Sequence, residues 1–465
     1  MIHLQSIEDF LRRDSAKLAN TVLDCPLCGR MHKTPFGKME VGRDLVEQIP
    51  SIAWKMFGYI PQRTSLIYDR AIEPLIRQRV SGPLVSGGMR LTMLGLGEPG
   101  SLLDSDRETA NSALAQADKD SELVIGAGSG VISDITKWVA TKIGAPFILL
   151  GTAPSMNSYT SDTASMTEND VKISVKLSPA EAILMDIELL STAPIEMIHA
   201  GMGDLAARAI CNADWKLSQL LRKTFFCPLP FQMTAENERQ YLADATETRV
   251  KKPQAIHRLA EAVLISGLSM TVVDETAPSS GAEHILSHFW DFLMHVRGLP
   301  RNLHGTQVGI GTIISLNLYD YMRKLDPGRI NPQAVLRSRP SIEEIEAENE
   351  KLYGHKAAIF NQVMRTKRIP DQEFIPYVRS ILDSWDQIWE ALDPYITPVE
   401  TIRAPLLKAG MTLTLEAIHR TRQEGLEALL KGSQYRNRYT MLDLAWELGI
   451  FPDAAEEILE LSQVV

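Results

Sequence analysis

Four of the chain's ten histidines fall in one stretch, residues 281–305, namely His284, His288, His295 and His304. Imidazoles bind divalent metals and transfer protons near neutral pH, so this clustering predicts a metal or proton-transfer site. His284 and His288 are four residues apart and would project from one face of a helix. The glutamate of zinc-dependent proteases is missing between them, because residues 285–287 are Ile-Leu-Ser. Two or three neutral imidazoles with a carboxylate would suit a divalent metal with an open coordination position.

Asp204 is the best carboxylate for such a site, since it lies between glycines and an apolar helical segment in HAGMGDLAARAI. An aspartate in that position either caps a helix or acts as a buried ligand, and the residues alone leave both interpretations open. His304 precedes Gly305, which permits a tight approach. His295 stands beside a charged residue, and we expect an ordinary helical or surface histidine there.

Two glycine patterns compete for a dinucleotide phosphate. GLGEPG, residues 95–100, matches G-x-G-x-x-G, but Pro99 lacks a backbone N–H and no clean helix opens there, so we interpret it as a turn. GAGSG, residues 126–130, follows an apolar strand, and a helix begins directly after it. Helix-start N–H groups and the helix dipole favour an anion, and the small residues let a pyrophosphate approach. The alternative is a tight strand-to-helix turn that holds no ligand.

The segment CPLCGRMH offers a second group of possible metal ligands, Cys25, Cys28 and His32. C-x-x-C followed by histidine is half of a zinc knuckle, and a closed zinc site needs four ligands. Cys211 and Cys227 stand far along the chain in apolar helical text, and nothing in the sequence selects His3 as the fourth ligand. A structural metal, a redox pair and a simple turn with two reduced thiols therefore remain alternatives.

Alternating strands and helices would position these groups. From residue 64, short apolar runs end in Gly, Asp or Ser and are separated by helical segments such as VISDITKWVATKIG, which predicts a parallel α/β sheet. ASMTENDVKISVKLS alternates like an inserted hairpin, and after residue 194 apolar residues follow helical spacing. The expected strands are TSLIYD, MRLTMLG, ELVIGAGSG, PFILLGTAPS and AILMD. We predict a helical lead-in of unclear role over 1–60, an α/β dinucleotide-binding domain over 61–193 and a helical metal-binding domain over 194–465.

Composition narrows the function classes. The chain has 465 residues, of which 45% are hydrophobic and 23% charged, as in globular proteins with sizeable cores. Its net charge of −10 argues against non-specific nucleic-acid binding, which needs a basic face. The N-terminus lacks the apolar core of a signal peptide, and four cysteines are too few for a disulfide scaffold. No run of about 18 apolar residues predicts a membrane span, so we expect a cytoplasmic protein.

Five motifs occur in order along the chain: GAGSGVISDITK, GTAPSMNSYTS, GMGDLAARAICNADWKL, SSGAEHILSHFWDF and LHGTQVGIGT. Together they resemble the superfamily of iron-containing alcohol dehydrogenases, glycerol dehydrogenases and dehydroquinate synthases, and within it the bacterial type of sn-glycerol-1-phosphate dehydrogenase. The resemblance covers residues 64–325 with specific motifs and does not explain the first 60 residues. It implies a Rossmann-like parallel-sheet domain followed by an all-α C-terminal domain, an active site in the cleft between them, and a homodimer.

The resemblance also implies roles for individual residues. Asp204, His284 and His304 match the family's metal ligands, with Asp204 also touching substrate, and His288 matches a residue lining the substrate pocket. Where the family commonly has Asp-Gly in contact with substrate, this chain has Asn157-Ser158, which keeps an acceptor and gains a donor but loses the charge. The matching coenzyme positions are Asp69, Gly128, Gly130, Val131, Ile132, Ser133, Asp134, Thr152, Ser155 and Ser161.

The implied reaction is the reversible reduction of dihydroxyacetone phosphate to sn-glycerol 1-phosphate by NADH or NADPH. A divalent Zn, Ni or Fe ion would polarise the carbonyl, and His288 would relay a proton. Lys137 and Arg301 are candidates for binding the phosphate of this small substrate. Three alternatives remain: a metal-dependent polyol or alcohol dehydrogenase, a sugar-phosphate cyclase of the dehydroquinate synthase type, and an inactive binding protein marked by Asn157.

Overall fold

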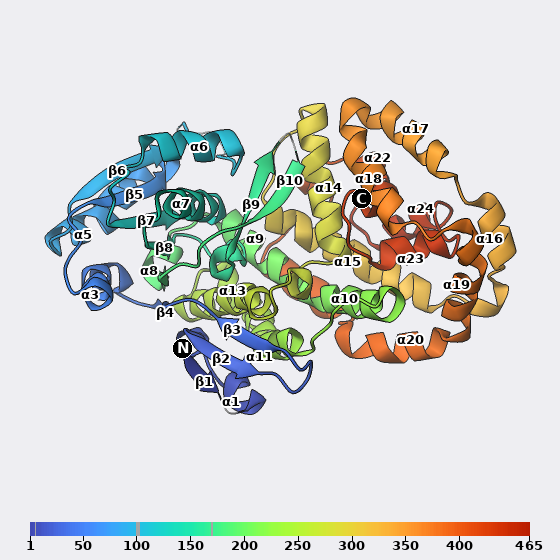
Figure 1. Cartoon of the computed structure of the whole chain (residues 1–465), viewed down its shortest axis with the longest axis horizontal. Helices are drawn as coiled ribbons and strands as arrows, with labels where there is room; N and C mark the ends of the chain where they lie inside the picture. Colours follow the sequence, from blue (N-terminus) through green and yellow to red (C-terminus); the bar gives the residue numbers. More distant parts are fainter. Residues whose placement is uncertain (5, 99–102, 169–170) are drawn as a thin grey trace. The chain divides into compact units, whose positions relative to one another are not determined.

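The computed structural model of the chain describes residues 1–4, 6–98, 103–168 and 171–465 (Figure 1). The chain forms two compact units. Unit 1 comprises Met1–Leu205, Pro228–Thr276 and Lys408–Gly410, and unit 2 comprises Ala206–Cys227, Ala277–Leu407 and Met411–Val465. Unit 1 therefore takes in the predicted lead-in and two later segments, a division that differs from the predicted boundaries at residues 60 and 193.

A six-stranded sheet with the order β4-β11-β8-β7-β5-β6 is the centre of unit 1, and every neighbouring pair in it is parallel. The predicted α/β fold with a parallel sheet is confirmed, and β5 and β11 have the predicted bounds. Their apolar runs are continuous because helices cover both faces of a parallel sheet. The strands are β4 (Lys38–Gly42), β5 (Thr64–Asp69), β6 (Leu91–Leu96), β7 (Leu123–Gly128), β8 (Phe147–Gly151) and β11 (Ala182–Asp186).

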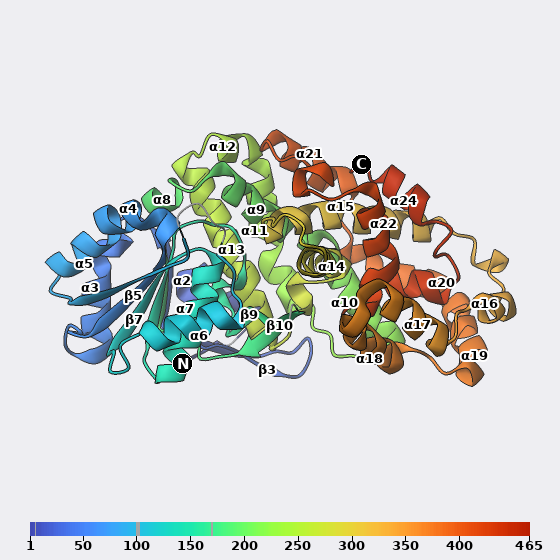
Figure 2. The same ribbon diagram turned by 90° about the horizontal axis from the view of Figure 1, so that it is seen from above.

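The helices of unit 1 pack on this sheet and on one another. Alternate residues of β5, β7, β8 and β11 form one core with α3 and the α4–α5 segment. Figure 2 shows α6 and α7 side by side, with α7 packed against β7. The helices are α1 (Ile7–Leu11), α2 (Ser15–Leu18), α3 (Leu45–Phe57), α4 (Glu73–Ile76), α5 (Gly82–Ser86), α6 (Arg107–Gln116), α7 (Gly130–Ile143), α8 (Ile187–Leu190), α9 (Ile195–Ala206), α11 (Leu229–Ala243), α12 (Ala245–Arg249) and α13 (Pro253–Val273).

The first 60 residues contain strands that the helical prediction missed. Strands β1 (Ile2–Leu4), β2 (Thr21–Asp24) and β3 (Met31–Thr34) form a small sheet in that order, with β2 and β3 antiparallel, and β4 joins the large sheet beside β11. The helical prediction holds for α1, α2 and α3, but it missed the strands because runs of three to five residues carry too little periodicity to be recognised. The segment has a fold-forming role, since it supplies one edge of the central sheet.

The hairpin predicted within the α/β unit is confirmed. Strands β9 (Thr163–Glu168) and β10 (Val171–Lys176) pair antiparallel, while the turn between them, residues 169–170, lies outside the described residues. Helix α13 is long and apolar enough to cross a membrane by length and composition, a property that the sequence analysis did not expect. Because 78% of its most apolar window is buried, it is a core helix of unit 1.

Unit 2 is helical throughout its described residues, as predicted for the C-terminal half. Helices α14 and α15 lie in close contact at Gly311. A Cβ atom at this position would stand 2.6 Å from the Glu283 carbonyl oxygen, so glycine permits the approach. The helices are α10 (Arg208–Arg222), α14 (Ala282–Arg297), α15 (His304–Arg323), α16 (Pro332–Ser338), α17 (Ile342–Tyr353), α18 (Ala357–Lys367), α19 (Asp371–Asp383), α20 (Trp385–Leu392), α21 (Val399–Lys408), α22 (Arg422–Lys431), α23 (Met441–Glu447) and α24 (Ala455–Leu461).

Candidate functional site

The glycine-rich turn predicted to bind phosphate lies where β7 ends at Gly128 and α7 begins at Gly130. A Cβ atom on Gly128 would stand 2.5 Å from Cβ of Ile132, so only glycine allows the helix to start this close to the strand. The first N–H groups of a helix have no partner inside it, and the Ser129 side chain does not cap them. Gly130 and Val131 are partly exposed. The turn therefore presents backbone donors where an anion can reach them.

Residues at the end of β8 lie beside this turn. The Thr152 N–H donates to the Gly128 carbonyl at 3.0 Å. The Tyr159 hydroxyl donates to the carbonyls of Gly128, at 3.2 Å, and Ala153, at 2.9 Å, and its burial raises its pKa, which keeps it a donor. Tyr159 thus fastens the two strand ends together. Tyr159 was not predicted from the sequence, although it is the one aromatic residue in the segment SMNSYTS that follows β8.

The remaining predicted coenzyme positions lie at the end of β5 or in the segment that follows β8. Asp69 ends β5, the strand next to β7, and its carboxylate accepts from the Ala71 N–H at 2.8 Å. Ser155 is buried beyond β8, and the Ser161 hydroxyl shares a hydrogen bond of 2.7 Å with that of Thr163. In the competing GLGEPG pattern, Gly97 has a φ of +75°, as the turn interpretation expects, and Pro99 and Gly100 lie outside the described residues.

Asp134 and Lys137 form a buried pair between α7 and the β9 hairpin. Asp134 accepts from the Ser165 N–H at 3.2 Å and lies 3.6 Å from the Lys137 ammonium. Burial raises the pKa of Asp134 to about 6, against the opposing effect of Lys137. Lys137 donates to the carbonyls of Ser158, at 2.6 Å, and Thr163, at 3.1 Å. Lys137 therefore holds the loop after β8 in place, a role that replaces its predicted contact with substrate phosphate.

Asp204 belongs to the last turn of α9, so it is not a helix N-cap. Its carboxylate accepts a hydrogen bond of 2.8 Å from the Asn157 N–H, and the Asn157 side chain donates to the Ser266 hydroxyl at 3.2 Å. Two glycines make this approach possible. A Cβ atom would stand 1.7 Å from the Pro154 carbonyl oxygen at Gly201, and 1.9 Å from that of Asn157 at Gly267. Helices α9 and α13 thus hold Asn157 against Asp204 in unit 1.

Three of the four clustered histidines come together in unit 2. Helix α14 carries His284 and His288, and His304 is the first residue of α15. The ring centroids are 5.1 Å apart for His284 and His304, 5.3 Å for His288 and His304, and 6.0 Å for His284 and His288. His295 lies two helical turns beyond His288 and is half-buried.

Neighbouring side chains fix the orientation of these rings. The Nδ1 atom of His284 lies 2.9 Å from Oε1 of Glu283, and that of His304 lies 3.1 Å from the Ser287 hydroxyl. A partner on Nδ1 selects the tautomer in which Nε2 binds a metal. Glu283 is fully buried and also accepts from the Gly281 N–H at 2.6 Å. The sequence analysis missed Glu283, which stands directly before the first histidine.

A second grouping in unit 2 includes His288. One ligand atom each from His288, Asp291 and His304 lies within 4.8 Å of the others. Gln307 donates to the Asp291 carboxylate at 3.0 Å, and Nδ1 of His288 is 3.9 Å from the other carboxylate oxygen. Burial and the nearby charge of Arg436 lower the pKa of His288 well below its usual value, so its ring is neutral at physiological pH.

Arg436 is a further residue that sequence reasoning missed. It is partly exposed, and its charge acts on both His288 and Asp291. The basic pair in YRNRYT was the available signal. Arg301, one of the two predicted phosphate-binding residues, is exposed. A guanidinium beside the imidazole cluster can bind a phosphate with two parallel hydrogen bonds.

Comparisons with known proteins identify a family and several relatives. The family model of iron-containing alcohol dehydrogenases matches residues 41–194. A glycerol-1-phosphate dehydrogenase (NAD(P)+) of Bacillus licheniformis is 31% identical over 312 residues, which cover 67% of this chain and 77% of the relative. One of Halalkalibacterium halodurans, with the same description, is 31% identical over 294 residues, covering 63% and 73%.

Solved structures show the same fold. An iron-containing alcohol dehydrogenase from Corynebacterium glutamicum matches with a TM-score of 0.58 and 15% identity, over 93% of this chain and 96% of the other. A probable glycerol dehydrogenase from Sinorhizobium meliloti matches with a TM-score of 0.57 and 14% identity, over 92% and 98%. At such low identity the likeness establishes the fold alone.

Proposed function

Since this chain belongs to the iron-containing alcohol dehydrogenase family, in its glycerol-1-phosphate dehydrogenase branch, we propose that it reduces dihydroxyacetone phosphate reversibly to sn-glycerol 1-phosphate with NADH or NADPH. The observation that carries the proposal is the 31% identity over 77% of the Bacillus licheniformis enzyme. The glycine turn and the imidazole cluster support it, because a dehydrogenase of this kind needs both a coenzyme site and a carbonyl-activating site.

The coenzyme pyrophosphate would bind at the start of α7. The backbone donors after Gly128 and the partly exposed Gly130 and Val131 support this placement. Thr152 at the end of β8 and Asp69 at the end of β5 flank the turn, because parallel strands present their carboxyl ends at one edge of the sheet.

We propose that Asp204, His284 and His304 would hold one divalent ion, Zn, Ni or Fe. One oxygen and two nitrogen donors suit these metals and leave a coordination position for substrate. The Nδ1 partners Glu283 and Ser287 support the assignment, since they leave Nε2 of each ring as the metal-binding atom. The ion would polarise the carbonyl of the substrate, and the coenzyme would supply the hydride.

The chain's own residues would bind and orient the substrate. Asn157, held by Asp204 and Ser266, presents an amide to the substrate hydroxyl. Arg436 binds the phosphate. His288, neutral through its burial, relays a proton to the oxygen that forms the new hydroxyl. We expect the enzyme to work in the cytoplasm. We also expect it to form a homodimer, which sedimentation of the purified protein would test.

The decisive test is NADH oxidation with dihydroxyacetone phosphate on protein reconstituted with Ni²⁺, Zn²⁺ or Fe²⁺, followed by stereochemical analysis of the product. We expect turnover with at least one metal and sn-glycerol 1-phosphate as the product. Absence of turnover with all three metals would overturn the proposal. Equal activity on unphosphorylated dihydroxyacetone would favour a polyol dehydrogenase, and conversion of a sugar phosphate without net NADH consumption would favour a cyclase.

The role of Arg436 has its own readout in the same assay. Arg436→Ala should raise the KM for dihydroxyacetone phosphate by about 100-fold, the loss expected for a charge-assisted pair of hydrogen bonds. The KM for unphosphorylated dihydroxyacetone should change little. A matched variant, Arg301→Ala, should leave both values unchanged, and the reverse result would assign the phosphate to Arg301.

A further inference from the structure

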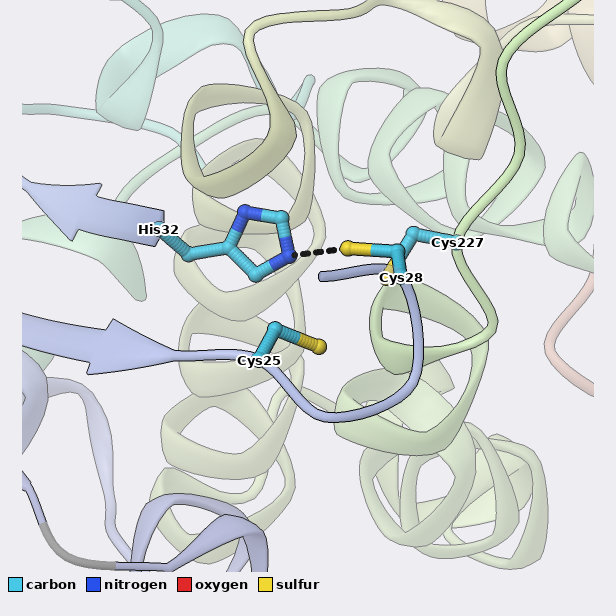
Figure 3. Close-up of side chains that lie close together, drawn as sticks. All are labelled: Cys25, Cys28, His32 and Cys227. Carbon is cyan, nitrogen blue, oxygen red and sulfur yellow. Dashed lines mark hydrogen bonds between the residues drawn. The ribbon is translucent and has the colours of Figure 1, made fainter. Parts of the chain in front are cut away.

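The two cysteines and the histidine of CPLCGRMH are joined by a third cysteine from a distant part of the chain (Figure 3). Cys25 directly follows β2, His32 lies in β3, and Cys28 lies in the turn between them. Cys227 is bonded to Pro228, at which the chain re-enters unit 1 just before α11, so one peptide bond ties its position to that unit. Cys227 stands about 200 residues from the C-x-x-C motif in the sequence, so spacing alone did not predict it as the fourth ligand.

The distances among the four side chains fit a tetrahedral metal site. One ligand atom from each residue lies within 4.8 Å of all the others, and Sγ of Cys28 is 3.3 Å from Nε2 of His32. Around a zinc ion with bonds of about 2.3 Å to sulfur and about 2.0 Å to nitrogen, the S–N and S–S edges would be roughly 3.5 and 3.8 Å. Small side-chain adjustments therefore suffice to form four bonds.

The turn that carries Cys25 and Cys28 is built to stabilise a thiolate. The N–H groups of Leu27 and Cys28 donate to the Cys25 sulfur. Gly29 has a φ of +71°, and its N–H donates to the Cys25 carbonyl at 2.8 Å. A turn whose N–H groups converge on a cysteine sulfur offsets the negative charge that metal binding leaves there.

His32 is prepared to act as the nitrogen ligand. It is 2% exposed, and its Nε2 atom lies 3.3 Å from Sγ of Cys28, so this nitrogen faces the cysteines. A hydrogen bond to the backbone of Val272 in α13 fixes the ring, as is usual for histidine ligands. The other candidate, His3, lies 3.0 Å from the exposed Asp24 carboxylate and belongs to a surface pair instead.

We propose that Cys25, Cys28, His32 and Cys227 bind one structural Zn²⁺ ion. Three sulfurs and one imidazole nitrogen form a closed set that suits zinc and leaves no position for substrate. The ion would fasten the β2–β3 hairpin to the start of α11. This site is distinct in residues and in donor chemistry from the Asp204, His284 and His304 set, and it does not depend on the proposed reaction.

A redox role for the Cys25–Cys28 pair fits the structure less well. Redox-active cysteines in C-x-x-C motifs are exposed and have lowered pKa values. Cys25 is 3% exposed and directly follows β2. None of the four cysteines, all of which are among the described residues, forms a disulfide.

Cobalt substitution tests the site by its own spectrum. The reduced protein, freed of metal and loaded with Co²⁺, should show an intense near-ultraviolet sulfur-to-cobalt charge-transfer band at a stoichiometry of one ion per chain. The Asp/His₂ set contains no sulfur and cannot produce this band. Absence of the band in the wild-type protein at saturating Co²⁺ would overturn the proposal, whether or not any variant folds.

Variants then identify the ligands. Cys227→Ser should weaken cobalt binding at this site by at least about 10-fold, because losing a direct ligand costs no less than losing a supporting partner. Cys227→His should restore binding with a weaker charge-transfer band. Cys211→Ser is the matched control, because Cys211 is also buried but donates to the Pro278 carbonyl at 3.0 Å. An unchanged band in Cys227→Ser, or a Cys25–Cys28 disulfide in the freshly purified protein, would contradict the assignment.

Discussion

Two clusters of this chain gather metal-binding side chains, but they differ in the kind and number of donor atoms. The thiol cluster consists of Cys25, Cys28, His32 and Cys227, and the imidazole cluster consists of His284, His288 and His304. Each cluster combines buried and partly buried members: Cys28 is partly buried beside three residues at most 3% exposed, and His288 and His304 are partly buried beside the buried His284. Four donors complete a tetrahedron, while two imidazoles with a carboxylate leave a position for a substrate oxygen. The number and chemistry of the donors, more than their presence, separate a structural ion from a catalytic one.

The surroundings of the two clusters differ in the same sense. Backbone N–H groups support the thiol cluster, and they need no further residue to do so. Side chains support the imidazoles, through Glu283 on His284 and Ser287 on His304. A catalytic ion needs ligands whose basicity is tuned and fixed, whereas a structural ion needs mainly a preformed turn. The two clusters should therefore respond differently to mutation.

Replacing an imidazole ligand should produce the largest effect on catalysis. His304→Ala should lower kcat/KM for dihydroxyacetone phosphate by about a thousandfold, since a Lewis acid contributes several kcal/mol to the barrier and each 1.4 kcal/mol is tenfold. The sulfur-to-cobalt band should be unchanged. His295→Ala, on the same helix as His284, serves as the control and should keep activity. Full metal content and activity in His304→Ala would show that the ligand set is wrong.

Replacing a thiol ligand should affect stability and spare catalysis. Cys227→Ser should lower the free energy of unfolding of the metal-loaded protein by about 3 kcal/mol, the size expected when a cross-link closing a long loop is lost. Thermal unfolding with and without a chelator would measure it, and the chelator should abolish the difference from wild type. Loss of turnover with an unchanged Tm would contradict the assignment of the thiol cluster to a structural ion.

The buried pair Asp134–Lys137 provides a reference that needs no metal. Because the pKa of Asp134 is about 6 when folded and close to 3.9 when unfolded, the folded state binds more protons between these values. Its contribution to stability is therefore fully present below about pH 4 and is lost as the pH rises through 6, by about 2–3 kcal/mol. Asp134→Asn should flatten the dependence of the free energy of unfolding on pH in this range. The effect should be the same with a chelator present as in the metal-loaded protein. An unchanged profile would contradict the shift.

The sequence predicted the parts of the fold whose signal is local. Strands β5 and β11 are short, mainly apolar runs ending in Asp, and α7 follows a glycine turn, so their composition and the residues that bound them sufficed to predict them. The strands β1 to β4 were missed because each is too short to show a period. Met39 and Val41 in β4 are buried because the strand pairs with β11 and is contacted by α2 and α13, which the sequence of β4 does not reveal.

The candidate sites divide in the same way. The spacing of His284 and His288 on one helix was predictable, and so was the C-x-x-C turn. Cys227 could not be predicted, because its approach to the turn depends on how α11 packs in unit 1. Lys137 was placed on the correct helix but given the wrong partner, since periodicity does not tell which face packs against the β9 hairpin. Such contacts follow from packing and not from spacing.

The smallest expected effect concerns the coenzyme turn, which should be independent of both metal clusters. A Cβ atom at Gly130 would stand 2.8 Å from Cε of Met156, the end of a flexible side chain that can move, so Gly130→Ala should fold. The added methyl would occupy space that the pyrophosphate needs, and the KM for NADH should rise about tenfold, or about 1.4 kcal/mol. Cobalt binding at either cluster should not change.

Gly144→Ala is the matched control at the other end of the same helix. Gly144 has a φ of +75°, so alanine there should cost about 1 kcal/mol of stability without touching the coenzyme. A rise in the KM for NADH in Gly130→Ala alone would place the phosphate at the start of α7. An equal rise in both variants would instead show that the turn acts through the stability of α7, because a purely structural change at either end would then suffice.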